Sequence, residues 1–246
     1  MSEIGTYLER VRAILSEAEQ TQAGVMEEAA GLLAAAIAEG HSIWTFGTGH
    51  AGIIAMELYY RTGGLAVINY LGAPGLVMDV MPPTLTTDME RLAGYGKAII
   101  AAHPVKPGDV MILHSVSGRN AVPVDTALHA KQAGASTICL TNLKTSSAVP
   151  SRHESGKRLY EVCDLVIDNC GSYGDAELEL QGFPERIAPT STAVGAALLN
   201  AVVARTVALL LEKGVVPPVF VSSNVPGGDE HNAKIMREHG GQIHYM

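Results

Sequence analysis

The sequence predicts an α/β protein with a parallel sheet covered by helices on both faces. Short apolar runs alternate along the chain with segments of helical spacing, and these runs are almost continuously apolar. Near-continuous apolar strands are typical of parallel sheets, which helices bury on both faces. No linker rich in Pro, Gly and Ser divides the 246 residues, so we expect one domain with terminal additions.

The individual elements follow from the spacing of apolar residues. Three- and four-residue steps from Ile4 to Ile37 predict one long amphipathic helix, or two in series. Apolar runs predict five strands, over 41–47, 65–71, 109–115, 136–142 and 164–170. Helical spacing predicts helices over 52–63, 86–103, 122–134 and 192–211. The last of these contains Asn200 and Arg205, so we expect a buried or subunit-packing helix and no membrane span.

Composition excludes several classes of partner. The formal net charge is −8, which argues against a nucleic acid or an anionic membrane as a general partner. The three cysteines are scattered, so we expect reduced thiols in a cytoplasmic protein. The N-terminus lacks the apolar core of a signal peptide. The histidines of the C-terminal segment lack the spacing of a metal site, so we expect no metal and no cofactor.

A turn of small polar residues follows the third predicted strand. The stretch VMILHSVSGRN, residues 110–120, places Ser115, Ser117, Gly118 and Asn120 before the next helix. Unpaired N–H groups at a helix N-terminus attract anions, so the turn predicts a phosphate site that needs no lysine. Alternatively, Ser117 and Asn120 only cap the helix. A second glycine turn, GTGHAG at 47–52, follows the first strand and favours the phosphate site.

Three motifs together resemble the sugar isomerase (SIS) domain family. They are GTGHA after the first strand, SVSGRN after the third, and PTSTAVGAALLNAVV opening the last long helix. The resemblance covers about 42–211 and implies a flavodoxin-like three-layer α/β/α sandwich with a central five-stranded parallel sheet. We therefore expect an N-terminal helical segment (1–41), an SIS domain (42–215) and a C-terminal extension (216–246). The extension would pack on the same domain or on a neighbouring subunit of a homodimer or homotetramer.

The resemblance also implies which residues bind a small-molecule sugar phosphate. They are Ser115, Ser117, Gly118, Arg119 and Asn120 for the phosphate, Gly47, Thr48 and Gly49 for the sugar, and Thr190 and Ser191 of the PTST segment. Two positions depart from the family pattern: Ala51 stands where serine is common, and Asn120 where threonine is common. Glu185 stands where a family histidine can precede PTST, so the role of that histidine does not transfer.

Isomerisation of an aldose phosphate requires a base for the C2 proton and a donor that stabilises the enediolate. The candidate bases are Glu57, Glu177 and Glu185. Glu57 could instead pair with Arg61, four residues on, and Glu185 could simply contact solvent. His50, inside the first glycine turn, and His153, in the loop PSRHESG, are the candidate acids. His153 could also be an ordinary surface histidine.

These features predict a phosphosugar-binding enzyme acting on an amino-sugar or hexose 6-phosphate. With a hydroxyl or free amine on C2, proton removal leads to aldose-ketose isomerisation. With an N-acetyl group, as in N-acetylglucosamine 6-phosphate, the carbanion epimerises or expels the C3 substituent, which is lyase or dehydratase chemistry. The alternative is a non-catalytic sugar-phosphate sensor or regulatory SIS protein, which needs the phosphate site but no proton-transfer residues.

Overall fold

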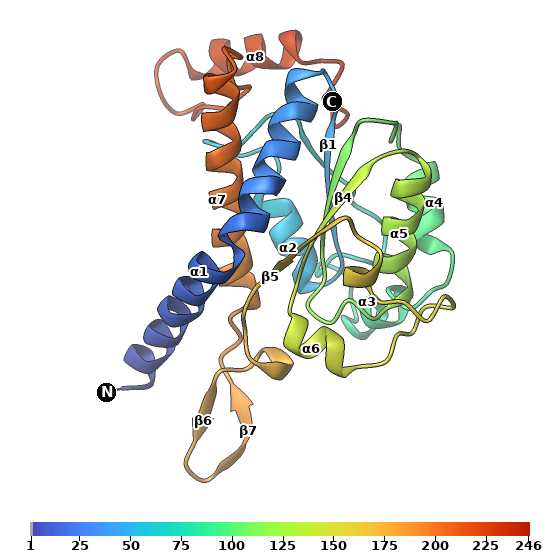
Figure 1. Cartoon of the computed structure of the whole chain (residues 1–246), viewed down its shortest axis with the longest axis vertical. Helices are drawn as coiled ribbons and strands as arrows, with labels where there is room; N and C mark the ends of the chain where they lie inside the picture. The colour runs from blue at the N-terminus through green and yellow to red at the C-terminus, as the bar shows by residue number, and fades with distance from the viewer. Residues whose placement is uncertain (1) are drawn as a thin grey trace.

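The computed structural model describes residues 2–246 and contains a five-stranded parallel sheet (Figure 1). The strands are β1 (Ile43–Gly47), β2 (Ile68–Tyr70), β3 (Val110–His114), β4 (Ser136–Thr141) and β5 (Leu165–Asp168). Their order is β2-β1-β3-β4-β5, and every neighbouring pair is parallel. This is the flavodoxin-like order, in which ligands bind outside the carboxyl ends of the strands where the chain order reverses. The predicted fold class is confirmed.

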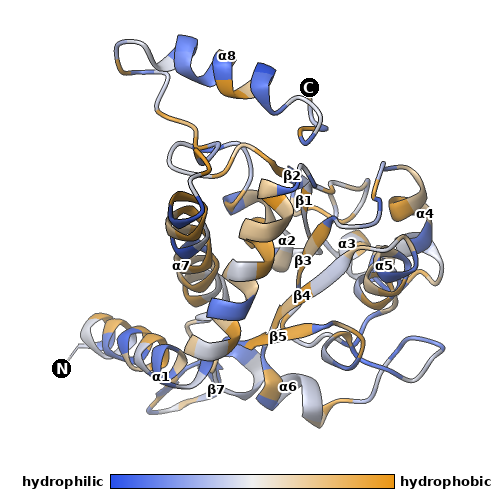
Figure 2. Ribbon diagram, turned by 45° about the horizontal axis from the view of Figure 1, so that its top comes forward, coloured by the Kyte–Doolittle hydropathy of each residue, from blue (hydrophilic) through white to orange (hydrophobic). Residues whose placement is uncertain are grey.

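Helices cover both faces of the sheet (Figure 2). One face is covered by α1 (Glu3–Ala38), α2 (His50–Glu57) and α7 (Ser191–Glu212), and the other by α4 (Tyr95–Ala101) and α5 (Ala121–Gln132). Alternate residues of one strand serve the two cores: Ile112 of β3 faces α1 and α7, whereas Met111 and Leu113 face α5. Of the two alternatives for the N-terminal segment, the structure shows one helix of 36 residues.

The apolar helix α7 is the one helix among residues 2–246 long and apolar enough to cross a membrane. In the fold it packs along α1, where Thr206 is fully buried and Arg205 pairs with Glu27 at 2.8 Å. Much of its apolar surface is therefore used inside this domain.

The predicted helix over 86–103 is wrong, because two helices occupy this region. They are α3 (Thr84–Met89) and α4, which starts after Gly94. Gly94, the N-cap residue of α4, has φ +78°, a left-handed conformation incompatible with a continuous helix, and its N–H donates to Asp125 at 2.6 Å. Helix α2 also ends earlier than expected, at Glu57, shortly before Tyr60 with φ +44°.

Several short elements were not predicted. They are α6 (Leu143–Ala148), the 3-10 turns η1 (Leu159–Glu161) and η2 (Tyr173–Asp175), and an antiparallel hairpin of β6 (Leu178–Leu180) and β7 (Phe183–Ile187). The hairpin extends from the body of the molecule, below the sheet in Figure 1. Most of β7 is exposed in this chain.

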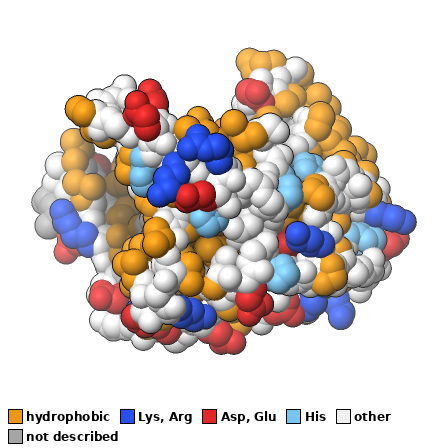
Figure 3. All heavy atoms as spheres, turned by 90° about the horizontal axis from the view of Figure 1, so that it is seen from above, with side chains coloured by type: hydrophobic (Ala, Val, Ile, Leu, Met, Phe, Trp, Pro, Cys, Tyr) orange, Lys and Arg blue, Asp and Glu red, His pale blue; other side chains and the backbone are white. Residues whose placement is uncertain are grey.

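The C-terminal segment covers the end of the sheet opposite the carboxyl ends of its strands. After α8 (Gly228–Glu238), the backbone N–H of His244 donates to Asn69, and the His244 ring stacks on Trp44 with centroids 4.9 Å apart. The hydroxyl of Tyr245 donates to the carbonyl of Ala66 at 2.7 Å. Figure 3 views this face from the α8 side, where side chains of both charges lie close to one another.

His114, the last residue of β3, makes the fold sensitive to acid. It is 2% exposed, and desolvation lowers its pKa to about 4. The imidazole binds a proton less readily in the folded protein than in the unfolded chain. The free energy of unfolding therefore falls as the pH drops below 6.5 towards 4. We expect this group to cost roughly 2 kcal/mol of unfolding free energy between pH 7.5 and pH 5.

Urea titrations of wild type and His114→Gln at the two pH values measure this contribution. The non-titrating glutamine should reduce the pH dependence of the unfolding free energy by that amount. An unchanged dependence in the variant would contradict the assignment.

Candidate functional site

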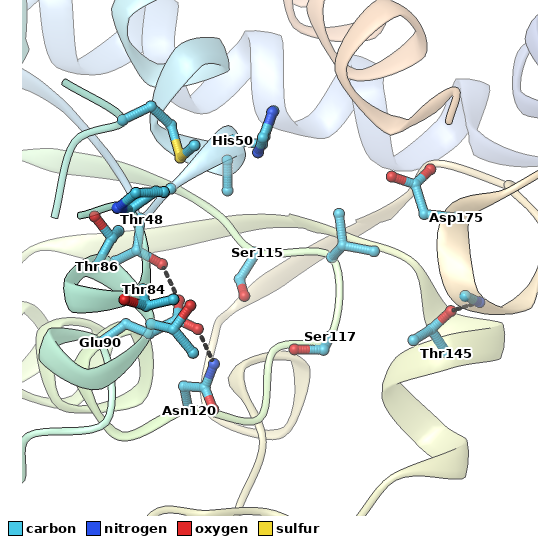
Figure 4. A pocket seen from close by; sticks show the side chains of 17 residues that line it. Thr48, His50, Thr84, Thr86, Glu90, Ser115, Ser117, Asn120, Thr145 and Asp175 are labelled. Carbon is cyan, nitrogen blue, oxygen red and sulfur yellow. Dashed lines mark hydrogen bonds between the residues drawn. The ribbon is translucent and has the colours of Figure 1, made fainter. Parts of the chain in front are cut away.

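A pocket of about 550 Å³ opens at the carboxyl ends of β1 and β3 (Figure 4). It lies where the strand order reverses, as expected for a ligand site in this fold. Its size is in the range of small-molecule sites. The lining residues that the argument uses are Thr48, Gly49, His50, Glu90, Ser115, Ser117, Asn120 and Asp175.

The first glycine turn forms one side of this pocket. Gly49 has φ +58° and leads into α2, which places His50 at the helix N-terminus with its side chain exposed. Thr48 is 5% exposed, and its hydroxyl donates to Glu90 at 2.8 Å. Gly47 lies behind the lining, where an added Cβ would come within 2.5 Å of the carbonyl oxygen of Ala51. Its role here is to allow close approach of strand and helix.

The turn after β3 presents unpaired backbone donors. Gly118 has φ +57°, and its N–H donates to the Ser115 hydroxyl at 3.2 Å. Within residues 2–246, the backbone N–H groups of Ser117, Arg119 and Asn120 donate no hydrogen bond. Together with the Ser115 and Ser117 hydroxyls at the pocket wall, these groups can bind an anion. Among the described residues 2–246, no lysine or arginine lines this pocket.

Asn120 occupies the N-cap position of α5 but does not cap the helix with its side chain. Its amide nitrogen instead donates to Glu90 at 2.5 Å, and its amide oxygen accepts from Arg152 at 2.9 Å. The capping alternative therefore fails for the side chain of this residue. The amide forms part of the pocket wall, and it contacts Glu90, which lies 30 residues earlier in the chain.

Glu90 and Asp175 are two charged pocket residues that the sequence analysis did not identify. Glu90 follows α3, and its carboxylate accepts hydrogen bonds from Thr48 and Asn120 (Figure 4). Burial raises the pKa of Glu90, and this outweighs the hydrogen bond from Thr48 and the charges of Arg91 and Arg152, which lower it. A carboxyl group with a raised pKa in a polar cleft is suited to proton transfer.

Asp175 of η2 lies across the pocket, and its carboxylate contacts the N-terminus of α7. Its carboxylate accepts the backbone N–H groups of Thr190 and Ser191, at 3.2 and 2.8 Å, and the Ser191 hydroxyl. Thr190 and Ser191 are buried behind Asp175 and do not line the pocket. In this chain, a carboxylate therefore already occupies the positive end of α7.

The three glutamates named from the sequence all lie outside the pocket lining. Glu57 pairs with Arg61 and accepts a hydrogen bond from Asn200 at 3.4 Å. Glu185 is exposed on β7.

Glu177 is 5% exposed and joins two distant segments of the chain. It accepts from Arg10 at 3.0 Å and from the Ser172 N–H and hydroxyl. Although burial alone would raise the pKa of Glu177, the hydrogen bonds from Ser172 and Arg10 lower it. A carboxylate held ionised in this way anchors α1 to the loop after β5.

His153 also lies away from the pocket. It is buried and pairs with Asp125 of α5 at 2.9 Å, while its other ring nitrogen is 2.7 Å from the Ser155 hydroxyl. It is therefore not an ordinary surface histidine, since the pair fixes the loop 151–155 on α5. Arg119 is partly buried beside this loop and does not line the pocket.

Among residues 2–246, no three His, Cys, Asp or Glu side chains are grouped as metal ligands would be. The polar groups at the pocket are hydroxyls, an amide, backbone N–H groups, two carboxylates and one imidazole. This set suits a hydroxylated anionic ligand, with Glu90 and His50 as the groups that can exchange protons.

Comparison with known families agrees with the fold. The SIS domain model matches residues 6–142. The chain belongs to the SIS domain family. A UPF0309 protein of Shouchella clausii is 46% identical over 246 residues, which cover 100% of both chains. A UPF0309 protein of Streptomyces coelicolor is 40% identical over 98% of this chain and 96% of its own.

Two solved structures share the fold at low sequence identity. The phosphoheptose isomerase of Francisella tularensis superposes with a TM-score of 0.56 at 14% identity, over 84% of this chain and 98% of that one. The phosphoheptose isomerase of Neisseria gonorrhoeae gives a TM-score of 0.51 at 17% identity, over 84% and 96%. These similarities establish the architecture of the SIS domain in this chain.

Proposed function

We propose that this SIS protein binds a sugar 6-phosphate and removes the proton from C2 of the sugar, with Glu90 as the base. The observation that carries the proposal is the Glu90 carboxylate itself. It lines the pocket beside the Ser115–Asn120 turn, and burial raises its pKa. The phosphoheptose isomerases that share the fold act on a phosphosugar, as their names state.

The Ser115–Asn120 turn is the proposed phosphate site. Its unpaired N–H groups and two serine hydroxyls supply donors without a lysine, which fits a protein of net charge −8. A phosphate held there would leave the sugar in the remaining pocket, between His50 and Glu90. This arrangement supports a phosphorylated sugar as the ligand class.

Dehydration of an N-acetylated amino-sugar 6-phosphate is the reaction that we propose. Glu90 takes the C2 proton, the electron pair forms the C2–C3 double bond, and the C3 hydroxyl leaves as water with a proton from His50. Elimination needs a base and a separate acid, and the lining supplies both groups. With a hydroxyl or free amine on C2, the same base would instead give aldose-ketose isomerisation.

The test is to incubate purified protein with N-acetylglucosamine 6-phosphate, glucosamine 6-phosphate, fructose 6-phosphate and unphosphorylated N-acetylglucosamine. Products are identified by proton NMR. We expect a vinylic signal from the first compound only. Formation of a ketose from glucosamine 6-phosphate would show that the protein is an isomerase and not a dehydratase. Binding of every phosphate with no product would favour a sensor.

Replacing Ser117 with alanine should weaken binding of the sugar phosphate. The lost hydroxyl is a donor to a charged group, so we expect the Kd to rise about 10- to 100-fold. Isothermal titration of the ligand into each variant measures this change. Ser147→Ala is the matched control, because Ser147 is an exposed serine outside the pocket lining. Equal affinities of wild type and Ser117→Ala for the sugar phosphate would show that this turn does not bind the phosphate.

A further inference from the structure

The side chain of Asn120 connects Glu90 to Arg152, a residue outside the pocket. Arg152 Nη1 donates to Asn120 Oδ1 at 2.9 Å, and Asn120 Nδ2 donates to Glu90 Oε1 at 2.5 Å. A guanidinium can only donate and an ionised carboxylate can only accept. The amide of Asn120 therefore has one orientation that satisfies both neighbours, and Arg152 dictates that orientation.

The backbone around these side chains is fixed as well. The N–H of Arg152 donates to the carbonyl of Arg119 at 2.7 Å, which ties the loop 151–155 to the pocket turn. The next residue, His153, pairs with Asp125 in the buried contact described above. The N–H of Val122 in α5 donates to the carbonyl of Glu90 at 3.1 Å. Loop, helix and Glu90 are thus held in one relative position.

Positive charge is concentrated next to this connection. Arg91 and Arg119 lie near enough to Arg152 to lower its pKa, after the larger effect of desolvation. Within residues 2–246, none of the three arginines forms a salt bridge. Arg91, on the segment of Glu90, and Arg152, on the neighbouring loop, both act on the Glu90 carboxylate. Their charge favours its ionised form, against the effect of burial.

We propose that Arg152 is a positioning residue for Glu90, which orients the carboxylate through the Asn120 amide. The inference rests on the proposed function, in which Glu90 is the base. Arg152 does not line the pocket, so it acts on the reaction through Asn120 and not by contact with the sugar.

The test compares Arg152→Gln, Arg152→Lys and the control Lys157→Gln. Lys157 is an exposed residue two positions after the loop 151–155. Without the guanidinium, the amide of Asn120 can turn and Glu90 loses a nearby positive charge. We expect Arg152→Gln to lower kcat about 10- to 100-fold with an unchanged KM. The acid limb of its pH–kcat/KM profile should move to higher pH, because loss of the charge raises the pKa of Glu90. Arg152→Lys should restore much of the pH profile, and Lys157→Gln should match wild type.

A direct titration of Glu90 separates this inference from the proposed function. In ligand-free protein labelled with 13C at glutamate carboxyls, the Glu90 signal is assigned by its absence in Glu90→Gln. Arg152→Gln should shift its titration midpoint to higher pH even if no substrate is turned over. An unchanged midpoint overturns the positioning role. So does a raised KM at constant kcat, which would make Arg152 a substrate-binding residue, or a loss of thermal stability with an unchanged pH profile.

Discussion

Glu90→Gln is expected to lower the rate of C2 proton removal by about 10²- to 10⁴-fold while leaving the sugar phosphate bound. Glutamine keeps the size of the side chain, and its amide oxygen can accept from Asn120 while its amide nitrogen donates to the Thr48 hydroxyl. It cannot take up a proton at neutral pH, so only proton transfer is lost. Rate measurements at saturating substrate, together with the Kd of the variant, distinguish loss of chemistry from loss of binding.

Asp88→Asn is the matched control for this experiment. Asp88 is an exposed carboxylate at the end of α3, two residues before Glu90 and outside the pocket lining. Its replacement should leave the rate within a few-fold of wild type. Full activity of Glu90→Gln combined with loss of activity in Glu57→Gln would identify Glu57, and not Glu90, as the base.

Asp109→Ala should be among the most destabilising single substitutions in the chain. Asp109 is fully buried, and its carboxylate accepts the backbone N–H groups of Ser42 and Lys106 and the indole N–H of Trp44. Removing the carboxylate leaves these donors without a partner, which costs on the order of 3 kcal/mol or more. The melting temperature should fall by roughly 6–12 °C for a domain of this size.

Differential scanning calorimetry of wild type, Asp109→Ala and Glu39→Ala tests this expectation. Glu39 has a side chain 72% exposed, so its replacement removes a charge without leaving a buried donor unpaired. A melting temperature of Asp109→Ala equal to that of Glu39→Ala would show that the Asp109 hydrogen bonds add little to stability.

The strands and glycine turns could be predicted because their signals are local. An apolar run such as 110–114 becomes a buried strand wherever it lies, and a glycine with positive φ can follow it directly. The turn at Ser115–Asn120 was predicted in this way, and a parallel sheet places such a turn at the carboxyl end of its strand, where ligands bind. The predicted sheet and the pocket edge therefore agree with the structure.

The proposed base, Glu90, could not be predicted because its environment comes from distant segments. Thr48 lies 42 residues before Glu90, and Asn120 follows 30 residues after it. Nothing in the segment TTDMERLAG distinguishes Glu90 from a solvent-exposed helix glutamate. Glu177 gave the opposite result. Its position in a glycine-containing loop after the fifth predicted strand favoured a functional role, whereas the fold uses it to hold Arg10. Burial and partners, which decide the role of a carboxylate, depend on the tertiary fold.

The central claim is that this pocket removes a C2 proton, and hydrogen exchange at that carbon tests it most directly. Wild-type protein in D2O with N-acetylglucosamine 6-phosphate should cause the C2 proton signal to disappear as a vinylic product signal grows, and Glu90→Gln should cause neither change. A C2 proton signal that persists at full intensity while the sugar phosphate is demonstrably bound would contradict the claim and leave a binding protein.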